Sequence, residues 1–264
     1  MPLRGRFCSA LEQSGPPPSL PARQATLASV AGQSPVTMED DSMSGAARLL
    51  AAFLSLFVFF CLTPKMASAQ PKRVLIFGDS LTSGFDLEPG TGYASALRRH
   101  LYLRGRNDFQ ILKTSRAGDE TSVALDRIPL AFSRGADVVI VELGGNDMLS
   151  NVDPGVVYRN LRTIVRYSKG VGARVILAGM VSLPKRDPTY KPRFDAIYPT
   201  LAAQEKVALY PFFLEGAFGN PRLMESDGEH PNEAGSDYIA ARMAPLVDRE
   251  LSATGRHHYG RARH

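Results

Sequence analysis

The sequence has no tryptophan and only two cysteines, Cys8 and Cys61, in 264 residues. Both cysteines precede residue 70, and the chain has none from there to its end. A disulfide framework, thiol catalysis and a cysteine-ligated metal are therefore excluded for residues 70–264. A hydrophobic core must hold this part together, and the segment is long enough to form one.

Several motifs of nucleotide, metal and hydrolase chemistry are also missing. The chain contains neither the phosphate loop GxxxxGK[ST] nor the dinucleotide motif GxGxxG, and it lacks the zinc motif HExxH. The α/β-hydrolase motif GxSxG is absent too. The net charge of +5 is mild, so we expect no nucleic-acid partner. We also expect no cofactor and no metal, because the tail histidines would bind metal only incidentally. These are His257, His258 and His264.

The first 69 residues differ in composition from the rest. Residues 1–42 are rich in Pro, Ser, Gln and Ala without a hydrophobic period, which predicts disorder or an extension upstream of the true start. Residues 43–69 have the pattern of a signal peptide, in which Arg48 precedes an apolar run and a small-x-small site ends at Ala69. The run is short for a membrane span, and an uncleaved anchor is the alternative. We expect a periplasmic or secreted protein.

Residues 70–252 predict one α/β domain. Short apolar runs alternate with longer amphipathic segments, which predicts a parallel sheet of about five strands in a three-layer α/β/α sandwich. The expected strands are residues 73–78, 109–114, 136–144, 174–181 and 207–212, and the expected helices are residues 92–103, 121–132, 156–171, 193–204 and 233–251. Residues 253–264 predict a basic, flexible tail that could make transient contact with a membrane surface.

Polar residues follow the expected strands, where function gathers in parallel sheets. Ser80 comes just after the first strand. A serine becomes a nucleophile when a base accepts its proton, and His230 suits that role because imidazole titrates near neutrality. Asp227 stands three residues before His230, a spacing that lets its carboxylate reach Nδ1 in a turn. We expect these three residues to form a catalytic triad.

Acyl transfer also needs donors for the developing oxyanion. The backbone N–H of Ser80, the N–H of Gly118 and the side-chain amide of Asn146 each follow a different expected strand. For Asn146, in the segment GGND, the alternative is a plain turn. Three further aspartates are alternatives to Asp227, but none stands near a histidine in the sequence, so each is expected to order its own loop. They are Asp79, Asp119 and Asp147.

The segments GDSLTSG, RAGDET, GGND and DGEHPN resemble the successive motif blocks of the SGNH (GDSL) hydrolase family. Within that family, VVIVELGGND, AIYPTLA and YPFFLEGAF are similar to the bacterial periplasmic acyl-thioesterase, lysophospholipase and arylesterase branch. The resemblance implies a flavodoxin-like fold with Ser80 as nucleophile, His230 as base and Asp227 as its orienting acid. It also implies that Ser80, Gly118 and Asn146 donate to the oxyanion.

The second block departs from the family pattern. Arg116 and Ala117 precede Gly118 where a Ser or Asn often stands in the family, so the resemblance does not fix the donor geometry at Gly118. Glu120 stands where many relatives have Thr, which is expected to change the charge near the mouth of the site. Neither departure touches the expected triad.

These features predict a serine esterase that acts on aryl esters, acyl esters or lysophospholipids, or on acyl thioesters, without an obligate protein partner. An O-acetyl esterase of cell-envelope polysaccharide is one alternative. A non-catalytic binding protein is another, although it would not need all three triad residues. Apolar residues in the expected mouth loops favour acyl chains, unless they only pack in the core. They are Met148, Leu149, Leu183, Phe212, Phe213 and Phe218.

We predict that export cleaves the chain after Ala69, because the small-x-small site ends there. N-terminal sequencing of the exported protein should then give Gln70 as its first residue. An exported protein that still begins at Met43 or earlier would instead be an anchored enzyme.

Overall fold

The computed structural model describes residues 70–183 and 187–254. The expected extension over 1–42, the signal peptide over 43–69 and most of the tail over 253–264 lie outside these ranges and stay predictions. Within the described ranges the sheet has five strands, close to where the sequence predicts them. They are β1 (Lys72–Gly78), β2 (Phe109–Lys113), β3 (Val138–Glu142), β4 (Arg174–Ala178) and β5 (Ala208–Tyr210).

The strands pair in parallel in the order β2-β1-β3-β4-β5. This is the flavodoxin-like order, and it confirms the expected fold class. In the central strands β1 and β3, residues 74–77 and 138–141 are fully buried. Such unbroken apolar runs are typical of parallel strands that are covered on both faces.

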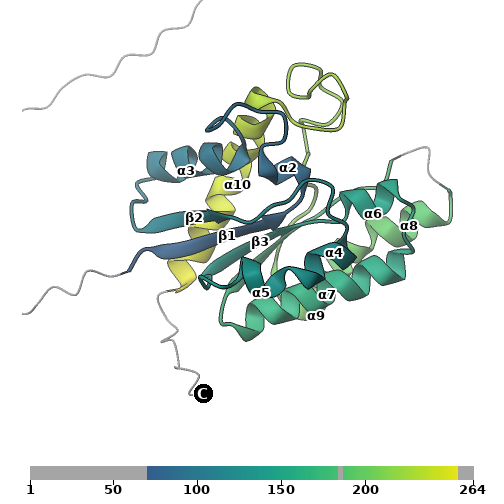
Figure 1. The fold of residues 1–264 in the computed structure, drawn as a ribbon, viewed down its shortest axis with the longest axis horizontal. Coiled ribbons are helices and arrows are strands. Elements are labelled where there is room, and N and C mark those ends of the chain that lie inside the picture. The colour runs from purple at the N-terminus through teal and green to yellow at the C-terminus, as the bar shows by residue number, and fades with distance from the viewer. Residues whose placement is uncertain (1–69, 184–186, 255–264) are drawn as a thin grey trace, which may run out of the picture. The chain divides into compact units, whose positions relative to one another are not determined.

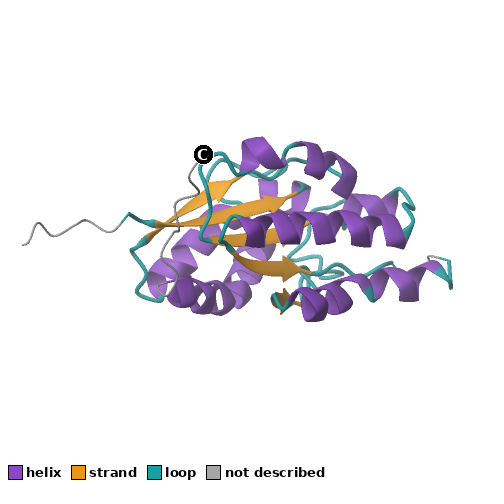
Figure 2. Cartoon of the chain, turned by 90° about the horizontal axis from the view of Figure 1, so that it is seen from below, coloured by secondary structure: helices purple, strands orange, loops and turns teal. Residues whose placement is uncertain are grey.

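Helices cover both faces of the sheet (Figure 1, Figure 2). On one face α3 (Tyr93–Leu103) packs against α10 (Glu233–Ala253). The other face carries α4 (Thr121–Asp126), α5 (Ile128–Ala131), α7 (Pro154–Gly170) and α9 (Ile197–Glu205). Three short helices follow strands or precede α9: α2 (Ser80–Ser83), α6 (Gly145–Leu149) and α8 (Tyr190–Asp195).

Two helices that the sequence predicts as continuous are each divided. The expected helix over 121–132 is split into α4 and α5, and Pro129 is the second residue of α5. The expected helix over 193–204 is shared between α8 and α9, and Pro199 is the third residue of α9. Proline has no N–H and its ring clashes with the carbonyl four residues earlier, so an unbroken helix is disfavoured at both places.

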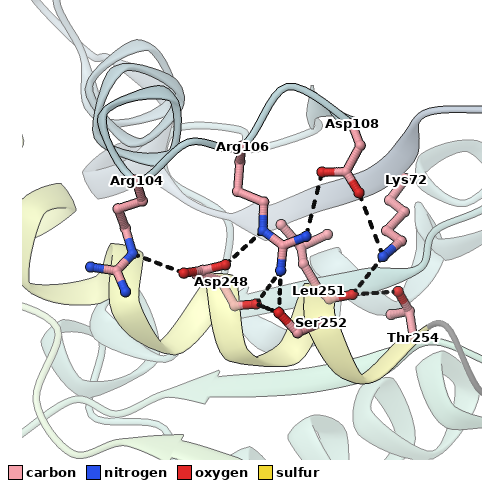
Figure 3. A network of polar contacts seen from close by, with 8 residues as sticks. All are labelled: Lys72, Arg104, Arg106, Asp108, Asp248, Leu251, Ser252 and Thr254. Atoms are coloured by element: carbon pink, nitrogen blue, oxygen red, sulfur yellow. Dashed lines mark hydrogen bonds and ion pairs between the residues drawn. The ribbon is translucent and has the colours of Figure 1, made fainter. Parts of the chain in front are cut away.

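Charged side chains fasten the last turns of α10 beside the start of β1 (Figure 3). The Asp248 carboxylate accepts from Nε of Arg106 at 2.6 Å and from Nε of Arg104 at 3.0 Å. Lys72, the first residue of β1, donates to the carbonyl oxygen of Leu251 at 2.9 Å. Because these contacts join segments far apart in the sequence, they fix the position of α10 against the sheet.

The other end of α10 fixes a loop of functional interest. Asn232 caps this helix, and its side-chain oxygen accepts from the N–H of Gly235 at 2.9 Å. His230 stands two residues before that cap, so the position of α10 determines where the imidazole lies. None of the helices within 70–183 and 187–254 is both long and apolar enough to cross a bilayer.

Candidate active site

Ser80 is the first residue of α2 and follows β1 after a single residue, Asp79. The Asp79 carboxylate caps the short helix by accepting from the N–H of Leu81 at 3.0 Å. The first N–H groups of a helix have no hydrogen-bond acceptor within that helix. Ser80 is the first residue of α2, so no carbonyl oxygen of α2 accepts from its N–H. The turn therefore presents the Ser80 hydroxyl and its backbone N–H at the same edge of the sheet.

His230 lies within hydrogen-bonding distance of Ser80 and Asp227. Its Nε2 is 2.9 Å from the Ser80 hydroxyl oxygen, and its Nδ1 is 2.6 Å from Oδ2 of Asp227. Because a carboxylate can only accept, Nδ1 carries the proton and the neutral imidazole turns the lone pair of Nε2 toward Ser80. The structure thus brings together the three residues that the sequence selects as a triad.

The Asp227 carboxylate is held in place by the loop that follows it. Its Oδ1 accepts from the backbone N–H groups of Glu229 at 2.8 Å and His230 at 3.0 Å. The hydrogen bond from the His230 backbone, together with that from its side chain, lowers the pKa of Asp227 to about 2. Asp227 is therefore an anion throughout the range in which imidazole titrates, and it can stabilise a positive charge on His230.

Gly118 and Asn146 lie on the rim of the same site. Gly118 has φ +81°, a conformation that favours glycine, while no atom lies within 4 Å of the place where a Cβ would stand. Backbone conformation, rather than lack of space, therefore explains glycine here. Asn146, in α6, donates from Nδ2 to Oδ2 of Asp79 at 3.2 Å and to the carbonyl oxygen of Asp119 at 3.1 Å.

The aspartates that rival Asp227 make other contacts. Asp79 caps α2 and accepts from Asn146. Asp119 forms an ion pair with Arg127. Asp147 accepts from the backbone N–H of Thr121 at 2.8 Å and from its hydroxyl at 2.6 Å. Each aspartate therefore orders its own part of the site.

A cavity of about 610 Å³ opens beside Ser80 and His230. Its walls are mainly apolar, and five of the six residues expected at the mouth line it: Met148, Leu149, Leu183, Phe212 and Phe218. The expectation is wrong for Phe213, which is fully buried and packs against Tyr93 with ring centroids 5.2 Å apart. The chain turns directly after β5, and there Phe212 lines the cavity while Phe213 is buried in the core.

Phe85 is a wall residue that the sequence reasoning missed. Its ring lies against the imidazole of His230, with centroids 4.9 Å apart, and its side chain is 41% exposed. Phe85 follows the segment GDSLTSG directly, but nothing in its spacing distinguishes it from a core residue. Among the described residues, no cluster of His, Cys, Asp and Glu could hold a metal ion.

Over residues 76–238, more than half of its length, the sequence matches the GDSL-like lipase/acylhydrolase family. The chain belongs to this family. It is 35% identical over 199 residues to an arylesterase of Vibrio mimicus, which covers 75% of this chain and 98% of that one. It is 32% identical over 200 residues to thioesterase 1/protease 1/lysophospholipase L1 of Escherichia coli strain K12, with 74% and 93% covered. The crystal structure of TesA has a TM-score of 0.64 and 32% identity, covering 68% of this chain and 100% of that one.

These comparisons confirm the resemblance drawn from the motif blocks. Because its relatives are named as an arylesterase and as a thioesterase and lysophospholipase, this GDSL hydrolase is a carboxylic ester hydrolase. The matched span includes Ser80, Gly118, Asn146, Asp227 and His230. The family match thus covers all the residues expected to form the triad and the oxyanion hole.

We predict that the Asp227 carboxyl titrates near pH 2 in NMR measurements on the free enzyme. In His230→Ala its midpoint should rise only part of the way to the ordinary value of about 3.9, because the backbone N–H groups of residues 229 and 230 still donate. Asp187 is a matched control, since its lowered pKa arises from Thr189 and should not move. A wild-type midpoint near the ordinary value would contradict this picture of the loop.

Proposed function

We propose that this GDSL hydrolase cleaves carboxylic esters through an acyl-enzyme on Ser80. The observation that carries the proposal is the continuous chain of hydrogen bonds from the Ser80 hydroxyl through His230 to Asp227, at the wall of an apolar cavity. A solvent-exposed structural serine has no need of an oriented base, whereas a nucleophile does. The non-catalytic alternative finds no support in this arrangement.

In the proposed reaction the Ser80 oxygen attacks the ester carbonyl carbon while His230 Nε2 accepts the hydroxyl proton. The tetrahedral intermediate then collapses, the bond to the leaving oxygen breaks, and His230 returns the proton to the departing alcohol. Water repeats the sequence on the acyl-enzyme, losing a proton to His230 and releasing the acid. Asp227 stays ionised throughout and stabilises the imidazolium that forms in each half.

The oxyanion of each intermediate would be bound by the N–H of Ser80, the N–H of Gly118 and the amide of Asn146. Asn146 has two N–H bonds, and both have partners in the free enzyme. To bind the oxyanion, the amide must exchange one of these partners for the substrate oxygen. The exchange favours the transition state because a charged oxygen is a stronger acceptor than a neutral carbonyl.

The cavity favours aryl or medium-to-long acyl esters over acetyl esters. An acetyl group needs only a small part of about 610 Å³, and an enzyme for O-acetylated polysaccharide would not need apolar walls such as Phe85, Leu149 and Phe218. We include thioesters and lysophospholipids in the proposed substrate class, in keeping with the name of the Escherichia coli relative. We retain the periplasmic or secreted location, and transient membrane contact, as proposals that rest on residues 43–69 and 253–264.

We expect p-nitrophenyl esters of increasing acyl length to be hydrolysed with kcat/KM rising beyond the acetyl ester. Ser80→Ala should abolish turnover, because the nucleophile is lost, and an organophosphonate should label Ser80 in the wild type. Ser83→Ala is a matched control in the same helix, since its hydroxyl only donates to the Ser80 carbonyl oxygen. Turnover by Ser80→Ala would refute the serine mechanism, and activity confined to acetyl esters would support the O-acetyl esterase.

We expect Asn146→Ala to lower kcat by about 10²–10³ with little change in KM, as loss of one oxyanion donor does. Asn146→Asp should be at least as damaging, because a carboxylate repels the oxyanion. Asn160→Ala is a matched control, since its amide bonds to the nearby Thr121 hydroxyl. Thermal melts run beside the kinetics separate unfolding from lost catalysis. If kcat of folded Asn146→Ala fell tenfold or less, Asn146 would be a turn residue and not an oxyanion donor.

A further inference from the structure

Two buried carboxyl groups lie beneath the candidate active site. Glu142 is the last residue of β3 and pairs in register with Gly78, so its side chain lies beside Asp79 at the end of β1. Glu142 is 0% exposed and Asp79 is 1% exposed. The proposed reaction uses neither carboxyl group directly. Two buried acids at the point where a nucleophile is held therefore need an explanation of their own.

The strand register and the burial of both residues place the two carboxyl groups near each other, and each influences the pKa of the other. A hydrogen bond between carboxyl groups needs a proton, because two carboxylates can only accept. The Thr82 hydroxyl donates to Oε2 of Glu142 at 3.3 Å, whereas no N–H or hydroxyl of the described residues donates to Oε1. This is the pattern expected when Oε1 belongs to a protonated acid, which is itself a donor.

The turn is built tightly around the Glu142 carboxyl group. A Cβ added at Gly78 would lie 2.2 Å from Oγ1 of Thr82 and 2.9 Å from Oε2 of Glu142. Glycine is therefore required before Asp79, because the Thr82 side chain and both the backbone carbonyl oxygen and the carboxyl group of Glu142 occupy the space beside it. The carboxyl group is part of the packing of this turn and cannot move out to solvent.

Asp79 connects this pair to the reacting groups. Its Oδ1 accepts from the N–H of Leu81 in the helix that begins with Ser80, and its Oδ2 accepts from the amide of Asn146. An ionised Asp79 holds both donors more strongly than a neutral one. A neutral Glu142 that donates to Asp79 would stabilise that ionised state without adding a second negative charge.

Other charged groups around the pair do not remove the need for a proton. Asp147 adds negative charge near Asp79, and His230 is the cationic neighbour when protonated. The buried hydroxyls of Tyr93 and Tyr198 donate elsewhere, to the sulfur of Met243 and to the carbonyl oxygen of Leu143. Arg127 donates to the Gly78 carbonyl oxygen and to Asp119. The ion pairs of Lys and Arg in the described part of the chain involve other carboxylates.

We propose that Asp79 and Glu142 share one proton at neutral pH and that Glu142 is a positioning residue for the active site. Its carboxylic acid donates to the Asp79 carboxylate, which in turn orients the Asn146 amide and the start of α2. The positioning role rests on the proposed function of Asn146. The shared proton does not, because it depends only on the burial and contact of the two acids.

The direction of both pKa shifts agrees with this assignment. Burial raises the pKa of Asp79 to about 6, and burial together with the charge of Asp79 raises the pKa of Glu142 well above its usual range. An acid whose pKa is raised by folding binds its proton more tightly in the folded state. Its contribution to stability is complete below the unfolded pKa and is lost as the pH rises through the folded pKa.

Glu142→Gln tests the shared proton without any assay of catalysis. Between about pH 6.5 and 8, folded wild type binds one more proton at this pair than unfolded wild type does, and the variant does not. The ratio of the wild-type unfolding constant to that of Glu142→Gln should therefore rise about tenfold per pH unit, as measured by urea unfolding. A ratio that does not change with pH would overturn the proposal.

Glu205→Gln is the matched control, because Glu205 is also a buried glutamate but its pKa is shifted in the opposite direction. Although burial raises the pKa of Glu205, hydrogen bonds from Arg166, Arg162 and Lys169 lower it to about 2. Glu205 is ionised in both states above pH 6.5, so the corresponding ratio should stay flat. A ratio for Glu205→Gln that climbed like that of Glu142→Gln would mean that the method reports general charge effects, and it would overturn the proposal.

Kinetics test the positioning role separately. Glu142→Gln keeps a neutral donor and should retain kcat within about threefold, whereas Glu142→Met lacks the donor and should lower kcat about tenfold or more at unchanged KM, as expected for a contact that acts in the transition state. Equal kcat in both variants would overturn the positioning role.

If the serine mechanism itself were wrong, Ser80→Ala would remain active while the pH-dependent unfolding ratio would be unaffected. If Glu142→Met does not fold, the ratio for Glu142→Gln still decides the shared proton.

Discussion

β1 and β3 pair in parallel with Gly78 beside Glu142, so the two central strands end side by side in the middle of the sheet. The order β2-β1-β3 reverses the direction of winding at this point, which leaves a crevice at the carboxyl ends of the strands. Ser80 follows β1 and Asn146 follows β3, so the backbone pairing sets the distance between them before any side chain is placed. Only the loop with His230 does not follow one of these two strands, and its position is set by α10, which begins three residues after His230.

The site contains carboxyl groups in opposite environments. Asp227 is partly exposed and receives two backbone N–H bonds, which keep it ionised, whereas Asp79 and Glu142 are buried and their pKa values are raised. Exposure suits an anion that must stabilise a transient imidazolium. Burial suits a pair that holds its geometry fixed, because water cannot reach the two acids and compete for the hydrogen bond between them. The same functional group therefore serves two purposes, and its surroundings decide which.

Much of this could be predicted from the sequence, for reasons that particular residues make clear. Buried parallel strands read as apolar runs, and the residues after them must lie at one edge, which is how Ser80, Gly118 and Asn146 could be grouped. The spacing of Asp227 and His230 is local, so a turn brings them together. The direction of a side chain in a loop depends on contacts with distant parts of the chain, which is why the sequence does not place Phe213 in the core or Phe85 beside His230. Glu142 looked like an ordinary strand end, because its partner Asp79 is 63 residues away in the sequence.

The contacts of Asn146 in the free enzyme affect how the site distinguishes the transition state from the bound ester. Asn146 is partly buried, and both N–H bonds of its amide have acceptors in the free enzyme, Asp79 and the Asp119 carbonyl oxygen. Under the proposed mechanism a substrate carbonyl must compete with one of these acceptors. A neutral ester oxygen competes poorly, since it offers no stronger bond than the one it replaces. The oxyanion competes well, because it carries a charge, so the exchange stabilises the transition state more than the bound ester. The internal acceptors thus weaken binding of the Asn146 amide to the neutral ester, while the amide can still bind the oxyanion as it forms.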